Sequence, residues 1–414
     1  MATVVTARVA PAVERVYSID VLRGLVMVVM ALDHTRDFYT GAPFEPEDLA
    51  RTDLALFLTR WITHFCAPAF ALLAGTGAYL AATRGLSRAE LSTKLRKRGL
   101  FVALLDPTIA AVGWTFLTPL PAGLVLWMLG LSMVALSWLV RWPVRWIALF
   151  GLAMIALHDL ADPINAASLG QIGGAIWKVL HVQGFIWLVP GKIPLWVVVY
   201  PLVPWIGVMA VGYALGASFE RPPRERQRVF LLVGAAATIA FVALRATHAY
   251  GNPPAGLTFG LPLSNGPFVV QPTAAKTVIS FLNVQKYPPS LQFLLMTLGP
   301  SLMLLAWLDR RFTDARPGRA SAILLVYGRV PMFYYLAHIY LIHAIAVVVA
   351  LAFRQPVLWL VTGGFLLNNR PPGYGHHLPF IYLMWILVVA MLFPLCRWFA
   401  DVKRRRRDWW LRYV

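Results

Sequence analysis

The stretch SIDVLRGLVMVVMALDHT (residues 18–35) places ionisable residues at both ends of an apolar run, residues 25–32. Asp20 and Arg23 precede the run, and His34 follows it. Charged side chains at such depths are costly in a membrane unless they face the protein interior or a water-filled path. The stretch therefore predicts a membrane helix with a functional polar face.

The composition of the whole chain is that of an integral membrane protein. Of its 414 residues, 59% are hydrophobic and 13% charged, and the mean hydropathy is +0.66. Soluble domains are about 45–50% apolar and roughly 25% charged. Apolar segments long enough to cross the hydrocarbon core recur along the chain. We expect an all-α fold of about ten membrane helices, at residues 17–39, 59–83, 99–118, 122–140, 144–158, 192–217, 229–248, 290–308, 320–353 and 379–400. The ninth segment is long enough to span once with strong tilt or to be broken at Pro331.

The basic residues that give the net charge of +19 gather in every second connection between these segments. This is the distribution of the positive-inside rule, so both termini are predicted to be cytoplasmic. It also argues against a nucleic-acid-binding surface, which needs one continuous basic face. We expect a cytoplasmic tail (1–16), one membrane domain (17–400) and a basic cytoplasmic tail (401–414), without a removable signal peptide, in a bacterial cytoplasmic (inner) membrane.

Cysteine and histidine spacing gives no metal site. Cys66 and Cys396 lie in separate apolar segments, and His338 and His343 are five residues apart, on different faces of a helix. We interpret these histidines as lining the core or a cavity, and we expect no bound metal. The absence of an internal repeat argues against transporters built from duplicated halves.

One face of the first helix is polar along its length. Asp20, Arg23, Met27, Met30 and His34 follow each other at spacings of three and four residues. Arg23 and His34 are separated by about 16 Å along the helix axis, at roughly 1.5 Å per residue. The face therefore carries a cation near the cytoplasm and an imidazole near the outer side.

The end of this helix has the residues of an acid–base site. In ALDHTRDF, His34 lies between the carboxylates Asp33 and Asp37, and such an anion can orient an imidazole that acts as a general base. Arg36 is a candidate for binding the substrate or stabilising an oxyanion. A covalent intermediate on the histidine is an alternative to general-base catalysis.

The candidate site also includes four residues from later parts of the chain. Asp106 and Arg329 lie within apolar segments, where Asp106 is a candidate partner of Arg23 and Arg329 a candidate phosphate ligand. In NVQKYPPSLQF, Tyr287 and Ser290 stand at the mouth of the eighth predicted helix, where a substrate would arrive.

Several motifs resemble the membrane acyltransferase superfamily. RVYSIDVLRG followed by LDH resembles the first helix of the acyltransferase family three enzymes, with its Arg-x10-His motif. FCAPAFALLAGTGAYL, PLVPWIGVMAVGYALG and YGRVPMFYYLAHIYLIH resemble heparan-alpha-glucosaminide N-acetyltransferase and its bacterial relatives. The resemblance covers most of the chain, although only the first-helix motif is specific.

The resemblance implies transfer of an acyl group, most often acetyl, from cytoplasmic acyl-CoA to a sugar or glycan acceptor on the outer side. His34 matches the catalytic histidine, and Arg23 matches the arginine that contacts CoA. The superfamily includes monomers and dimers, so a homodimer is possible. In the animal heparan enzyme an asparagine stands at the place of His34 and the active histidine lies in the next loop. The matching loop has no histidine before His64, so His64 is the alternative to His34.

Two other classes of protein remain alternatives. A proton-coupled transporter or permease would use Asp33, His34 and Asp106 as a relay. A purely structural membrane protein would leave the polar face of the first helix without a function.

Overall fold

The computed structural model describes residues 16–118, 121–189, 191–252, 257–258, 261–262, 266–313, 315, 317–364, 370–406 and 408–412. The predicted tail 1–16 lies outside these residues except for Val16. The predicted tail 401–414 begins inside the last helix, which continues to Arg405.

Long helices make up most of the described chain. They are α1 (Tyr17–Tyr39), α3 (Cys66–Ala82), α4 (Arg88–Leu105), α6 (Val125–Leu139), α7 (Val144–Leu157), α9 (Val203–Gly216), α10 (Pro223–Thr247), α12 (Leu291–Thr313), α13 (Arg319–Arg329), α14 (Pro331–Ala352) and α16 (Leu378–Arg405). Shorter helices extend or connect them: α2 (Leu54–Trp61), the 3-10 turn Ile62–Phe65, the π-helical turn Asp106–Ala110, α5 (Ala111–Thr115), α8 (Gly170–Leu180), α11 (Ala274–Leu282) and α15 (Leu358–Val361).

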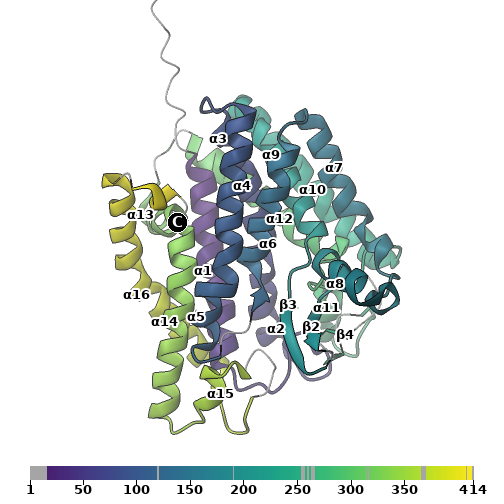
Figure 1. Ribbon diagram of the computed structural model, residues 1–414, viewed down its shortest axis with the longest axis vertical. Coiled ribbons are helices and arrows are strands. Elements are labelled where there is room, and N and C mark those ends of the chain that lie inside the picture. Colours follow the sequence, from purple (N-terminus) through teal and green to yellow (C-terminus); the bar gives the residue numbers. More distant parts are fainter. Residues whose placement is uncertain are drawn as a thin grey trace, which may run out of the picture.

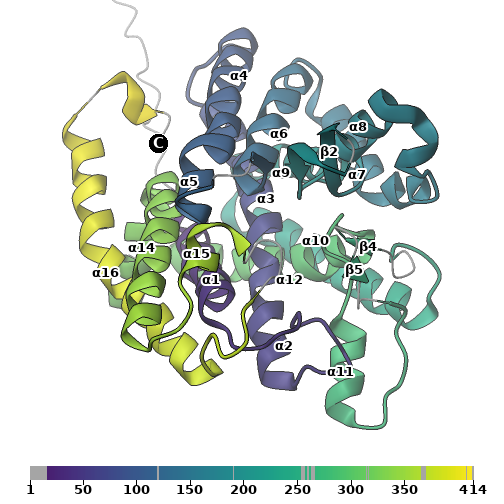
Figure 2. The same ribbon diagram turned by 60° about the horizontal axis from the view of Figure 1, so that its bottom comes forward.

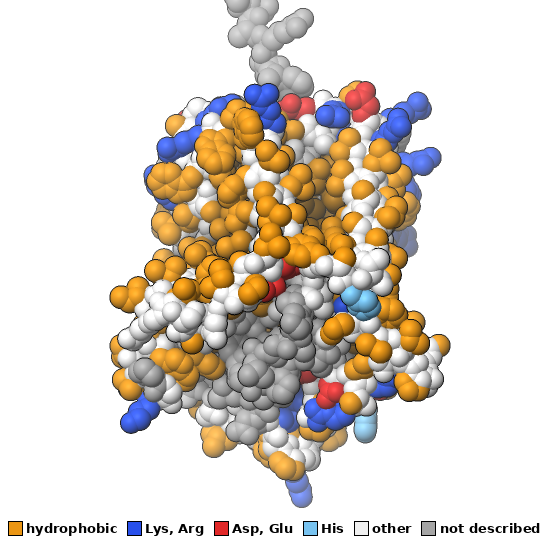
Figure 3. All heavy atoms as spheres, turned by 90° about the vertical axis from the view of Figure 1, so that its right-hand side faces the viewer, with side chains coloured by type: hydrophobic (Ala, Val, Ile, Leu, Met, Phe, Trp, Pro, Cys, Tyr) orange, Lys and Arg blue, Asp and Glu red, His pale blue; other side chains and the backbone are white. Residues whose placement is uncertain are grey.

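The helices run between two ends of an elongated bundle (Figure 1). One end carries the start of α1, the described C-terminal residues and the connections 83–87, 140–143 and 217–222. We call it the basic end, because Lys and Arg side chains gather along it while hydrophobic side chains cover the middle of the bundle (Figure 3). The opposite end, the far end, carries the segments 40–53, 184–198 and 283–290.

The helices confirm an all-α integral membrane protein. Seven helical stretches of the described chain are long and apolar enough to cross a membrane, beginning at Leu54, Val144, Val203, Pro223, Leu291, Pro331 and Leu378. Helix α6 is apolar but shorter, and α1 and α4 are not among the seven. The count of ten crossings therefore stays a prediction.

One predicted helix begins with a strand in the structure. Residues 192–217 were expected to form one helix, but their first part is strand β3 (Ile193–Val198), and α9 begins only at Val203. The β-branched residues of β3 favour an extended chain, and Pro204 suits the first turn of a helix. The long segment 320–353 is divided into α13 and α14, with Pro331 as the first residue of α14, which confirms the predicted alternative of a break at this proline.

A small sheet covers part of the far end. Strand β3 pairs antiparallel with β2 (Gly184–Val189) and parallel with the short β1 (Ala122–Gly123), in the order β1-β3-β2. A separate two-stranded ribbon joins β4 (Leu257–Thr258) and β5 (Leu261–Pro262). These connections at the far end thus contain short strands.

Helix α1 lies inside the bundle, where it contacts α3, α12, α13, α14 and α16 (Figure 2). Its crossing with α13 is very close: a Cβ atom added to Gly24 would lie 1.9 Å from the carbonyl oxygen of Leu324, and one added to Gly328 would lie 1.9 Å from that of Asp20. Small residues allow such close packing of membrane helices. This crossing fixes the position of the polar helix relative to its neighbours.

Candidate active site

The imidazole of His34, near the far end of α1, is hydrogen-bonded to a second histidine on α14. The distance between His34 Nδ1 and His338 Nε2 is 2.7 Å, and the two rings stack with centroids 4.9 Å apart. Trp114 meets the His34 ring edge on, with 4.8 Å between centroids. His338 is fully buried, whereas His34 remains partly exposed. One imidazole is therefore accessible, and the other supports it from inside.

The tautomers of the two rings follow from a backbone carbonyl. His338 Nδ1 lies 3.0 Å from the oxygen of Tyr334, and a carbonyl oxygen only accepts, so this nitrogen carries the hydrogen. The other nitrogen of a neutral imidazole is an acceptor, so His338 Nε2 accepts the hydrogen of His34 Nδ1. A neutral His34 then keeps its lone pair on Nε2, the nitrogen available to act as a general base.

Arginines hold the carboxylates that lie on either side of His34 in the sequence. Arg36 donates to Asp33 at 3.1 Å and to Asp37 at 2.6 Å. Arg60, on α2, also donates to Asp33, and it donates to Glu47 at 2.8 Å. These five side chains form one chain of ion pairs, which links α1, α2 and the segment 40–53 and which we call the ion-pair network.

The orienting partner of His34 thus differs from the sequence-based prediction. Asp33 and Asp37 were expected to orient the ring, but their oxygens accept from arginines, and His338 occupies the position expected of a carboxylate. Neighbouring residues of a helix point about 100° apart, so an adjacent carboxylate is poorly placed to reach the ring. Arg36, the predicted acceptor ligand, is itself buried between the two carboxylates.

His64, the alternative catalytic histidine, lies beside the ion-pair network. Its Nε2 is 3.5 Å from Glu47 Oε1, neither ring nitrogen has a hydrogen-bond partner among the described residues, and only 1% of its surface is exposed. Burial by itself would raise the pKa of the Glu47 carboxyl. The Arg60 guanidinium and His64 outweigh that effect and hold the pKa well below its ordinary value.

Asp106 has a local structural partner. Its Oδ2 accepts the backbone N–H of Trp127 at 2.6 Å, in the first turn of α6. Carboxylates are favourable at this end of a helix. The predicted pairing with Arg23 is therefore replaced by a capping interaction. The proton relay of the transporter alternative also lacks its links, because Asp33 is held by arginines and Asp106 by the backbone.

The two predicted donor-binding arginines lie toward the basic end. Arg23 donates to Asp20 at 3.1 Å and to the carbonyl oxygen of Gly328 at 3.3 Å. Arg329 directly follows Gly328 in the sequence and is exposed at the end of α13. The crossing of α1 and α13 therefore brings the Arg23 side chain next to the backbone of Arg329.

The two predicted acceptor-binding residues differ in their surroundings. The hydroxyl of Tyr287 lies 3.2 Å from that of Tyr200, and the ring is half-buried. Ser290 is 1% exposed, and its hydroxyl accepts the backbone N–H of Phe293 at 3.1 Å. Ser290 thus caps the start of α12, as serine commonly does at helix N-termini.

The contacts of three site residues were not predicted from the sequence. His338 was interpreted as lining the core or a cavity, although an ionisable group in an apolar segment is itself a functional signal. Arg60 and Glu47 were not assigned a role, because their pairing depends on how the segment 40–53 folds back over α2. No periodic pattern predicts that contact.

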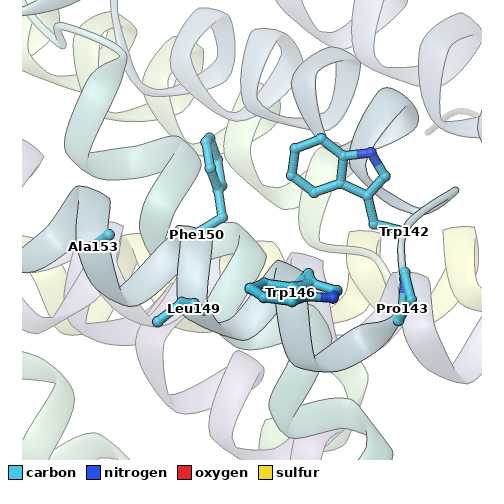
Figure 4. A pocket seen from close by; sticks show the side chains of 6 residues that line it. All are labelled: Trp142, Pro143, Trp146, Leu149, Phe150 and Ala153. Carbon is cyan, nitrogen blue, oxygen red and sulfur yellow. The ribbon is translucent and has the colours of Figure 1, made fainter.

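An apolar groove on α7 is separate from this site (Figure 4). Its lining residues are all apolar: Trp142, Pro143, Trp146, Leu149, Phe150 and Ala153. Two exposed tryptophans close to a basic connection are typical of a membrane interface, where lipid covers such a surface. In the part of the chain that the structure describes, no group of three or more His, Cys, Asp or Glu side chains could hold a metal ion.

Comparison with known families gives a match over the first part of the chain. Residues 15–249, more than half of the chain, match the family model described as heparan-alpha-glucosaminide N-acetyltransferase, catalytic. The matched region contains α1, the ion-pair network and His64. A search of curated proteins found no match.

Proposed function

Because the chain belongs to the heparan-alpha-glucosaminide N-acetyltransferase catalytic family, we propose that it moves an acetyl group from acetyl-CoA to a sugar or glycan acceptor across the membrane. Membership of this family implies an acetyltransferase embedded in a lipid bilayer. The donor, the acceptor and the roles of individual residues form the proposal.

The single observation that carries the proposed chemistry is the directed hydrogen bond from His34 to His338. It leaves His34 Nε2 as the base that removes a proton from the attacking amine or hydroxyl of the acceptor. As the new bond to the acetyl carbon forms, the carbon–sulfur bond breaks. The proton held by His34 then passes to the departing sulfur of CoA. His338 is a positioning residue in this scheme, since it contacts His34 and not the reacting atoms.

The position of Arg23 supports entry of the donor from the basic end. Arg23 lies about 16 Å along α1 from His34. With the neighbouring Arg329, it supplies positive charge for the phosphates of CoA, which arginine recognises by charge-assisted hydrogen bonds. The thioester would then extend along α1 toward His34. The basic end is the cytoplasmic side in this orientation.

The acceptor approaches from the far end. Tyr287 and Tyr200 present a polar, partly accessible surface there, and a sugar can contact both hydroxyl groups and aromatic faces. The arginines of the ion-pair network keep Asp33 and Asp37 in place instead of contacting the acceptor. Their role is to hold the end of α1 that carries His34.

Sealed vesicles containing the purified full chain test this proposal. Labelled acetyl-CoA is added outside, and 4-nitrophenyl α-glucosaminide is trapped inside. We expect labelled acetylated product inside the vesicles from protein molecules whose basic end faces outward. The function would be contradicted if no acetylated product formed, or if product also formed without the protein or without acetyl-CoA. Stable label on the protein before acceptor is added would indicate an acyl-enzyme, whereas direct transfer leaves the protein unlabelled.

A further inference from the structure

Lys286 is a buried cation that the ion-pair network does not use. It lies in the segment 283–290 between α11 and α12 and is 6% exposed. Among the described residues it has no hydrogen bond or ion pair, and its ammonium lies 5.0 Å from the centroid of the Tyr287 ring. Burying a charged group without a direct hydrogen bond or ion pair is costly, so a lysine kept in this state at a candidate site is a candidate for a function.

The segment that carries Lys286 is firmly attached to the rest of the far end. Asn283 Nδ2 donates to the carbonyl oxygen of Glu47 at 2.8 Å, and the backbone N–H of Leu291 donates to Asp159 at 2.8 Å. His158 Nε2 lies 2.8 Å from the carbonyl oxygen of Pro289. The backbone on both sides of Lys286 is thereby fixed, which is what electrostatic preorganisation of a charged group requires.

The surroundings of Lys286 connect it with the proposed base. Asn283, three residues before Lys286, donates to the backbone of Glu47. Glu47 pairs with Arg60, which also pairs with Asp33, the residue before His34. Asp33 already accepts from two arginines. Lys286 therefore adds positive charge to a region whose carboxylates are already paired with arginines. It is placed to stabilise a negative charge that develops during a reaction.

A neighbouring pair of tyrosines adds a neutral donor. The hydroxyls of Tyr200 and Tyr287 share one hydrogen bond, which uses the hydrogen of one of them. The hydrogen of the other remains available, whichever of the two donates. The Lys286 ammonium lies over the ring of Tyr287, whose hydroxyl belongs to this pair. Two donors to one oxygen are the usual composition of an oxyanion site.

We propose that Lys286 and the Tyr200–Tyr287 pair form the oxyanion site of the acetyl transfer, an inference that rests on the function proposed above. When the acceptor attacks the thioester carbonyl carbon, the π electrons move to the carbonyl oxygen. The Lys286 ammonium and one phenolic hydroxyl donate to that oxygen while it is negative. When the electrons return, the carbon–sulfur bond breaks, and the thiolate takes the proton held by His34.

Kinetics of Lys286→Met and Lys286→Arg in the full chain test the inference, with the exposed Lys192→Met as the matched control. Two reactions are followed: hydrolysis of acetyl-CoA without acceptor, and transfer to 4-nitrophenyl α-glucosaminide. We expect Lys286→Met to lower the turnover number of both reactions by about 100- to 1,000-fold, the loss typical of a missing oxyanion donor. The KM for acetyl-CoA should change by less than about threefold, because the donor acts in the transition state. Lys286→Arg should keep part of the activity.

The outcomes separate this inference from the proposed function. Unchanged turnover in Lys286→Met, or a higher KM for the acceptor alone, would overturn the oxyanion role; the second result would mean that Lys286 binds the acceptor. A wild type that neither binds nor hydrolyses acetyl-CoA would overturn the function itself. Should Lys286→Met fail to fold, Lys286→Cys treated with 2-bromoethylamine restores an ammonium at this position. Recovery of turnover on that treatment supports the inference, and recovery of folding without turnover contradicts it.

Discussion

His34 and His64 lie at the same end of the molecule, but their surroundings differ in one decisive respect. His34 belongs to a directed hydrogen-bond chain through His338 to a backbone carbonyl and remains partly exposed. His64 is almost fully enclosed, and its ring nitrogens lack hydrogen-bond partners among the described residues. A general base needs a defined tautomer and access to its substrate. The comparison therefore favours His34 as the base and gives His64 a place beside the ion-pair network.

The largest effect on the free energy of unfolding is expected from breaking the ion pairs of Arg60, which lie beside His64. Arg60→Met removes the cation shared by Asp33 and Glu47 and leaves both carboxylates buried with weaker partners. Breaking a buried ion pair in this way costs about 3–5 kcal/mol. Reversible unfolding in mixed micelles measures the change.

The matched control is Arg51→Met, which breaks a more exposed ion pair with Asp48. Such surface pairs are worth about 0–1 kcal/mol. Equal losses in the two variants would mean that the ion-pair network does not stabilise the far end.

A smaller effect, on the turnover of acetyl-CoA, is expected from removing the hydrogen bond between His34 and His338. His338→Phe removes the acceptor of His34 Nδ1 and with it the preference for the tautomer that leaves Nε2 free. We expect turnover of acetyl-CoA to fall by about 10- to 100-fold, less than the full contribution of a general base. Binding of CoA should be unchanged, as measured by titration calorimetry.

His343→Phe provides the control for this experiment. His343 is on the same helix and fully buried, but its Nδ1 contacts the carbonyl oxygen of Gly113 at 2.9 Å instead of His34. Its loss should affect stability without lowering turnover to the same degree. A similar rate in His338→Phe and wild type would remove His338 from the mechanism.

The smallest expected effect is on the pH dependence of stability. The folded state holds the pKa of Glu47 below the unfolded value, which is about 4.3 for glutamate. Its ionised form therefore stabilises the fold above that pH, and this stabilisation is lost as the pH falls toward the folded value. Melting temperature in detergent should decrease below about pH 4, and Glu47→Gln should make that decrease less steep.

Glu225, exposed in the first turn of α10, is the control for this measurement. Glu225→Gln should leave the acid dependence as it is in the wild type. An unchanged slope in Glu47→Gln would show that the pairing of Glu47 with Arg60 contributes no acid sensitivity.

The sequence predicted the fold better than the contacts of the site. Length and hydropathy located α1, α7 and α16 within a few residues, because membrane thickness determines both properties. The strand β3 was missed because a short apolar run does not distinguish a strand from the beginning of a buried helix.

Within the site, features that lie on one helix were predicted from the sequence, whereas contacts between different elements were not. The polar face of α1 was predicted from spacing alone, since it lies within one helix. The partners His338 and Arg60 come from other elements, so their contacts depend on the tertiary arrangement of α1, α2 and α14. Lys286 was visible in the sequence, but its burial against the ring of Tyr287 becomes evident only when its neighbours are known.

The assignment of His34 as the base is tested by comparing His34→Gln with His64→Gln in the hydrolysis of acetyl-CoA by the full chain in lipid nanodiscs. We expect His34→Gln to lose about 100- to 10,000-fold in turnover, the contribution of a general base, and His64→Gln to lose less than about tenfold. Both variants should still bind CoA. The reverse order, with His34→Gln active and His64→Gln inactive but still able to bind CoA, would contradict the assignment of His34 as the base.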